Sequence, residues 1–203
     1  DLFGTVRMDQ GAGAIDLKIE SANLKTHIQG ILREQGMELK EALEASIRLT
    51  PEMSAFLLKD VGPLFVTGLS AQNLVTLHIE PSGFFFPYPF SLPSLKVGKA
   101  TLNLGKVRCQ NGKSLVTIVS LLKANNLANK SEMDVWFTPV TFQINQGVVK
   151  AGRLDALLDN SIHVCSWGKI DLIKDKLNMI LGLPSDTLNA SFGIQNLPEN
   201  YVL

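Results

Sequence analysis

Hydrophobic and polar residues alternate along much of this chain, the pattern of a β-strand with one buried face. The clearest early run covers residues 14–20, where Ile15, Leu17 and Ile19 fall between charged residues. Residues 37–49 keep the alternation, although their composition would also suit a helix, so we expect a strand there. The first part of the chain is therefore predicted to be rich in strands.

The middle of the chain continues in the same way. Residues 66–79 predict a further pair of strands. Residues 95–107 predict either a strand pair or one bent strand, because the alternation changes phase at Gly98. A glycine inside a strand often marks a bulge, and a bulge shifts the alternation by one residue.

Alternation is cleanest after residue 134 and predicts an antiparallel meander. Its strands are expected at 136–144, 148–158, 162–172 and 177–183, with polar turns at 145–147, 159–161 and 174–176. One face of this meander should carry Val140, Phe142, Ile144, Ile162, Val164, Ile170, Leu172, Leu177, Met179, Leu181 and Leu183. The opposite face should carry Thr141, Gln143, His163, Trp167, Lys169 and Asp171.

Two segments favour short helices instead of strands. Thr50, Pro51 and Glu52 are suited to the first turn of a helix, which we expect over 51–61. The apolar run at 114–123 ends in two asparagines and predicts a second helix that covers part of the sheet.

These elements define a mainly β protein: an extended, bent antiparallel sheet, meander-like and groove-like, with two or three short helices. We divide it into a β-rich region with short helices, residues 1–133, and the antiparallel meander, residues 134–203. The two regions are expected to form one continuous structural unit. The chain opens on Asp1 and closes in an apolar run, so we expect it to be a piece of a longer protein.

A cluster of aromatic residues follows the strands expected at 66–79. Its rings are Phe84, Phe85, Phe86, Tyr88 and Phe90. Pro87 and Pro89 cannot donate to a strand ladder, so the segment should be an extended edge or loop whose rings cannot all face one core. The rings either plug one end of the sheet core or form an exposed lip that touches a ligand or a membrane.

Composition narrows the possible functions. The chain has 19 basic and 19 acidic residues, and this balance does not favour nucleic acid as a partner. The sequence lacks the common hydrolase, zinc and redox motifs, and its three histidines are isolated, so we expect no enzyme activity, cofactor or metal. It has no membrane-spanning segment or signal peptide. Cys109 and Cys165 are either bridged or, as we favour, two buried thiols.

Residues 134–183 resemble the C-terminal repeat of the AsmA-like family of bacterial envelope proteins. The resemblance is carried by Phe142-Gln143-Ile144-Asn145-Gln146-Gly147-Val148, Gly168-Lys169-Ile170-Asp171-Leu172 and Leu177-Asn178-Met179-Ile180-Leu181. These segments match the family's apolar strand with a polar turn and glycine, its Gly-x-Ile-Asp-Leu signature and its Leu-x-Met-x-Leu strand. They cover about a quarter of the chain closely.

The resemblance implies a non-enzymatic module of a double-membrane bacterium, in a parent protein anchored in the inner membrane and reaching into the periplasm. Its apolar face would contact the acyl chains of phospholipid during transport between inner and outer membrane. An ordinary core covered by other elements would show the same alternation in the sequence. The alternative function is a structural scaffold for envelope assembly proteins in outer-membrane biogenesis.

Overall fold

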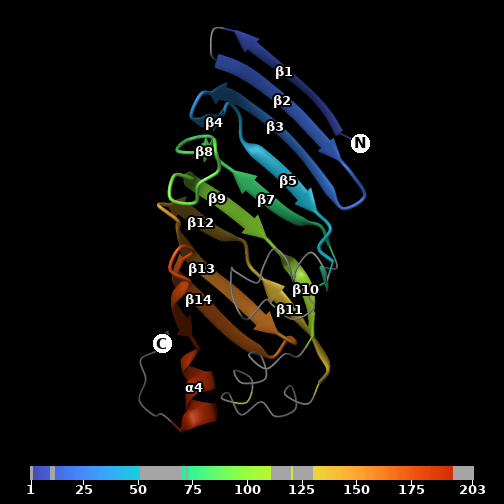
Figure 1. Cartoon of the computed structure of the whole chain (residues 1–203). Helices are drawn as coiled ribbons and strands as arrows, with labels where there is room; N and C mark the ends of the chain where they lie inside the picture. The colour runs from blue at the N-terminus through green and yellow to red at the C-terminus, as the bar shows by residue number, and fades with distance from the viewer. Residues whose placement is uncertain are drawn as a thin grey trace.

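The protein is mainly β, as the alternation predicts. The structure is a computed structural model that describes residues 2–9, 12–50, 70–71, 73–110, 120 and 130–193. Its strands form one antiparallel sheet that is strongly curled into a half-barrel (Figure 1). The expected bent antiparallel sheet is therefore confirmed.

The first eight strands of the chain lie at one end of the sheet, except the sixth, which lies at the opposite edge. They are β1 (Leu2–Asp9), β2 (Ala12–Glu20), β3 (Leu24–Arg33), β4 (Gly36–Leu39), β5 (Leu43–Ile47), β6 (Ser70–Ala71), β7 (Val75–Ile79) and β8 (Phe86–Pro87). The chain then continues through β9 (Val97–Asn103), β10 (Gly105–Gln110), β11 (Glu132–Phe137), β12 (Val140–Asn145), β13 (Val148–Leu158), β14 (Ile162–Asp171), β15 (Lys176–Gly182) and the helix α4 (Ser185–Phe192).

Several predicted strands are interrupted in the structure. The segment 37–49 is not one strand but β4 and β5, which both pair with β3 on either side of a short break. Of the segment 66–79 the structure describes 70–71 and 73–79, which contain two strands as expected, but these strands do not pair with each other: β6 pairs with β10, whereas β7 pairs with β5 and β9. Of the two readings of 95–107, the bent strand is the correct one, since β9 and β10 pair with β12 and β11 and not with each other.

The meander after residue 134 has five strands instead of the predicted four, because the first is divided into β11 and β12. The division falls at Thr138 and Pro139, and Pro139 has no N–H to donate. Thr138 keeps the break bonded to β13. It donates its own N–H to the Asp155 carbonyl at 3.0 Å, and its Oγ1 accepts the Asp155 N–H at 3.0 Å. Registry is unchanged across the break, since Phe137 lies opposite Gly105 and Val140 opposite Leu102. The predicted strands 148–158, 162–172 and 177–183 match β13, β14 and β15 to within a residue.

Two bulges decide which side chains share a face. In β9 the register with β12 shifts between Val97 and Ala100, which is the phase change expected at Gly98. Gly98 is required because a Cβ there would lie 2.3 Å from the Ser82 carbonyl oxygen. In β13 the register with β14 shifts between Ala151 and Leu154, around Gly152. Leu154, Ala156 and Leu158 therefore lie on the same face as Val149 and Ala151.

The two faces of the sheet differ in chemistry. The outer face carries polar contacts between strands, including Lys99 with Glu80 at 2.6 Å and His27 with Asp16 at 2.6 Å. The inner face is apolar and contains two groups of buried side chains. The end core consists of Leu49, Val75, Leu104, Val107, Cys109, Met133, Val135, Ala156, Leu158, Ile162, Leu183 and Leu188. The middle cluster consists of Leu39, Phe84, Val97 and Ala100.

The two predicted helices lie almost entirely outside the residues that the structure describes. The helix expected at 51–61 lies outside the described residues, and so does the one at 114–123 apart from Ser120, which is helical. The structure adds α4, which the alternation did not indicate, and its Leu188 is 2% exposed in the end core. Within the described ranges, no helix has the length and apolar character that crossing a bilayer requires.

An apolar cavity on the inner face of the sheet

A cavity of about 330 Å³ opens on the inner face between β9, β12, β13, β14 and β15. Its described lining residues are Leu102, Leu104, Val140, Phe142, Ile144, Val149, Ala151, Gly152, Leu154, Ser166, Ile170, Leu172 and Met179. Among these, only Ser166 has a polar side chain. Because neighbouring strands enclose a hollow only where their sheet curls, the apolar face is the concave one here.

Small residues lie in the cavity wall and next to it. Phe142, Ala151, Gly168 and Met179 lie opposite one another on four successive strands, so two small residues stand between two large ones. Gly168 cannot be enlarged, because a Cβ there would lie 2.8 Å from the Met179 Cα. Gly152 is similarly close to Thr141 Oγ1, at 2.9 Å from an added Cβ. Gly168 and Gly152 thus allow the neighbouring strands to approach closely, while Phe142, Ala151 and Met179 line the cavity.

The predicted face assignments of the meander agree with the strand registers, but its candidate lipid-contact residues have three different surroundings. Val140, Phe142, Ile144, Ile170, Leu172 and Met179 line the cavity. Ile162 belongs to the end core and Val164 packs against it. Leu177 and Leu181, in the edge strand β15, are 52% and 38% exposed. The inner face of the sheet is therefore a covered core near α4 and an open hollow around Phe142.

Sequence reasoning missed half of the cavity wall. Val149, Ala151, Gly152, Leu154 and Ser166 line it but do not stand out in the alternation. The bulge at Gly152 changes the phase within β13, so alternation alone assigns its two halves to opposite faces. Adjacent small residues, Ala151 and Gly152, in the middle of an otherwise bulky strand were the available signal.

The rings of the aromatic segment differ in exposure. Phe84 is 9% exposed and packs in the middle cluster, where it covers part of the apolar face. Phe85 is half-buried. Phe86, Tyr88 and Phe90 are 41%, 77% and 58% exposed, which confirms that some rings remain accessible.

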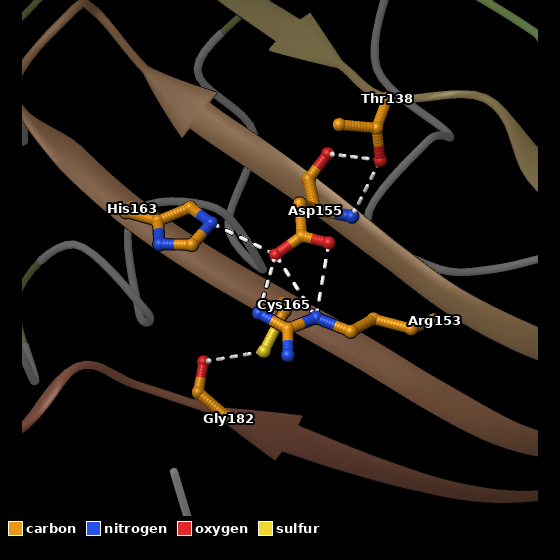
Figure 2. Close-up of polar contacts among 6 residues, drawn as sticks. All are labelled: Thr138, Arg153, Asp155, His163, Cys165 and Gly182. Carbon is orange, nitrogen blue, oxygen red and sulfur yellow. Dashed lines mark hydrogen bonds and ion pairs between the residues drawn. The ribbon is translucent and has the colours of Figure 1, made fainter. Parts of the chain in front are cut away.

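A group of polar side chains lies on β13 and β14, centred on Asp155 (Figure 2). Arg153 donates to both carboxylate oxygens of Asp155, with its shortest contact 2.7 Å from Nη2 to Oδ1. His163 lies 2.9 Å from the same Oδ1. The hydrogen bond from Arg153 is the main reason that the pKa of Asp155 is lowered. The His163 contact links β14 to β13 at Asp155, the residue that also bonds to Thr138 beside the break at Pro139.

Cys165 lies close to this group without being activated by it. Its thiol donates to the Gly182 carbonyl at 3.7 Å, and burial raises its pKa. Burial also raises the pKa of Cys109 to about 12. Both cysteines are free and buried, as we favoured, so neither is held as the thiolate that nucleophilic catalysis needs.

Like His163, His27 and His78 each contact a carboxylate on a neighbouring strand, Asp16 and Glu44 respectively. In the part of the chain that the structure describes, no three potential ligands converge on a metal position.

Comparison with family models, with curated proteins and with solved structures found no match to this chain. Functional inference therefore depends on the cavity and its surroundings.

Proposed function

We propose that this chain is a non-enzymatic lipid-binding module, and that its apolar cavity holds acyl chains during lipid transport between the inner and outer membranes of a bacterial envelope. The observation that carries the proposal is the cavity itself, about 330 Å³ with a wall of apolar side chains. Binding pockets for small molecules begin at about 300 Å³, and an apolar cavity of about 150 Å³ already binds benzene. The resemblance to AsmA-like proteins supports the periplasmic setting and an inner-membrane anchor in the parent protein.

The chemistry of the wall fits an acyl chain better than a polar ligand. An acyl chain needs no hydrogen-bond partner, and the backbone groups of the wall are already engaged in the sheet. Each methylene buried contributes about 0.8 kcal/mol, so two methylenes should strengthen binding slightly more than tenfold. Affinity should rise with chain length until the cavity is full and then level off.

A chain-length series tests the proposal. Saturated fatty acids of increasing length are titrated against protein loaded with a fluorescent fatty acid, and each dissociation constant is obtained by displacement. We expect close to tenfold tighter binding per two methylenes at the short end of the series, followed by a plateau. Uptake that is undetectable at every length, or that depends on the headgroup and not on the chain, would contradict the proposal. Native mass spectrometry of protein purified from bacterial membranes should in addition reveal bound phospholipid.

A second candidate function is a scaffold in outer-membrane assembly, favoured by one feature of the sheet. Within the described part of the chain, β15 pairs only with β14. Its exposed apolar residues are Leu177, Ile180 and Leu181, and Lys176 is its only charged residue. Such an edge can accept a strand from a partner protein.

Crosslinking separates the two candidates. A photoreactive amino acid at Asn178, which is exposed on β15, should capture envelope proteins in cells if this edge is a docking strand. Capture of lipid at Met179 without protein at Asn178 favours the lipid-binding module instead.

A further inference from the structure

The exposed part of the aromatic segment has a distinctive structure, which we call the aromatic tip and define as Phe86, Tyr88 and Phe90. The Phe86 and Phe90 rings lie 5.4 Å apart, centroid to centroid. Residues 81–93 contain no charged side chain. The tip is therefore an apolar projection with one polar group, the Tyr88 hydroxyl.

Backbone contacts hold the tip in place. Phe86 and Pro87 pair with Met37 and Gly36 through β8 and β4, and the Tyr88 N–H donates to the Gln35 carbonyl at 2.9 Å. Gly36 permits this approach, since a Cβ there would lie 2.2 Å from the Phe86 carbonyl oxygen. Because the backbone is already ordered, binding at the tip costs little conformational entropy.

The base of the tip reaches the cavity wall. Phe84, two residues before Phe86, packs in the middle cluster, against which Phe142 and Ile144 also pack. Phe142 and Ile144 line the cavity. Phe84 therefore links the chain segment that carries the tip to a cluster shared with side chains of the cavity wall.

We propose that the aromatic tip is a membrane-contact site whose rings enter the interfacial layer of a lipid bilayer. Exposed aromatic rings with a tyrosine hydroxyl match this layer, where the ring is buried and the polar group stays hydrated. The lack of charge in residues 81–93 favours a bilayer contact that does not depend on anionic headgroups. This site rests on the proposed lipid-binding function, for which it supplies a point of exchange between membrane and cavity.

Vesicle binding tests the site with a matched pair of triple variants. The tip variant combines Phe86→Ser, Tyr88→Ser and Phe90→Ser. The control combines Phe3→Ser, Leu74→Ser and Ile180→Ser, which replace residues that are 61%, 49% and 48% exposed elsewhere on the molecule. Binding to neutral phosphatidylcholine vesicles is measured by flotation, at low and high salt. We expect the wild type to bind equally at both salt concentrations, the control to stay within about twofold, and the tip variant to bind at least tenfold more weakly, which is about 1.4 kcal/mol.

Several results would overturn the proposal: no vesicle binding by the wild type, equal losses in the two variants, or a wild-type dimer that the tip variant disrupts. Uptake of a fluorescent fatty acid without vesicles is measured in parallel and should be the same in all three proteins. Failure of that uptake alone contradicts the cavity function and leaves the membrane contact standing. If the tip variant does not fold, Tyr88→Trp replaces it: its emission should shift to the blue on adding vesicles, and an unchanged spectrum refutes the contact.

Discussion

Two alanines in one strand offer a direct test of whether the cavity is an unfilled space. Ala151 and Ala156 both belong to β13 and lie on its inner face. Ala151 lines the cavity, whereas Ala156 is 7% exposed within the end core. Leucine adds three carbons at either position. At Ala151 these carbons can enter the hollow, and the gain is at most about 2 kcal/mol from about 0.8 kcal/mol per carbon. At Ala156 the same carbons must displace packed neighbours, which costs about 1–3 kcal/mol.

The two variants are compared by thermal denaturation and by uptake of a fluorescent fatty acid. Ala151→Leu should be as stable as the wild type or more stable, and its uptake should fall because the added side chain occupies the cavity. Ala156→Leu should melt roughly 2–4 °C lower per kcal/mol lost, while folded protein should retain uptake. The reasoning is refuted if Ala151→Leu loses as much stability as Ala156→Leu, since the space would then be filled, or if it takes up fatty acid normally.

Three further predictions concern stability and reactivity. Hydrogen bonds from Lys106 and Arg108 lower the pKa of Asp134 in the folded protein. The stability that Asp134 contributes is therefore fully present above the unfolded-state pKa of about 3.9, and it is lost as the pH falls through the lower folded-state pKa. Asp134→Asn should therefore flatten the decline of melting temperature below about pH 4, and an unchanged decline would argue against these contacts. Because burial raises the pKa of the Cys109 thiol to about 12, iodoacetamide at pH 8 should label Cys109 only as fast as the protein unfolds, and rapid labelling of native protein would contradict its burial. Gly98→Ala should destabilise the protein by at least about 1 kcal/mol in denaturant titrations, since its Cβ would lie 2.3 Å from the Ser82 carbonyl oxygen; a neutral result would show that the turn before β9 yields easily.

The hairpins of the C-terminal meander could be predicted because their turns have local sequence signals. Gln146 and Gly147 adopt φ of 51° and 71°, and Asp159 and Asn160 adopt 48° and 56°. Glycine, asparagine and aspartate tolerate these left-handed conformations better than other residues. The strands between such turns then show which residues alternate, and this gave the face that carries Phe142 and Met179.

The cavity could not be predicted from the same signals. It depends on Leu102, Ala151 and Met179, which are far apart in sequence and meet only after four strand pairings are fixed. Alternation identifies an apolar face but does not show how much volume its neighbours leave empty. The bulge at Gly152 and the break at Pro139 also change local geometry in ways that a regular two-residue period does not contain.

Photolabelling with a diazirine-bearing fatty acid is the most direct test of the claim that this cavity binds acyl chains. After irradiation, the labelled residues are mapped by peptide mass spectrometry, with and without excess unlabelled fatty acid. The account predicts competed labels on Phe142, Leu172 and Met179, with all three lost in Ala151→Leu. Labels that fall on exposed Leu177 or Ile180, or that excess fatty acid does not displace, would contradict it.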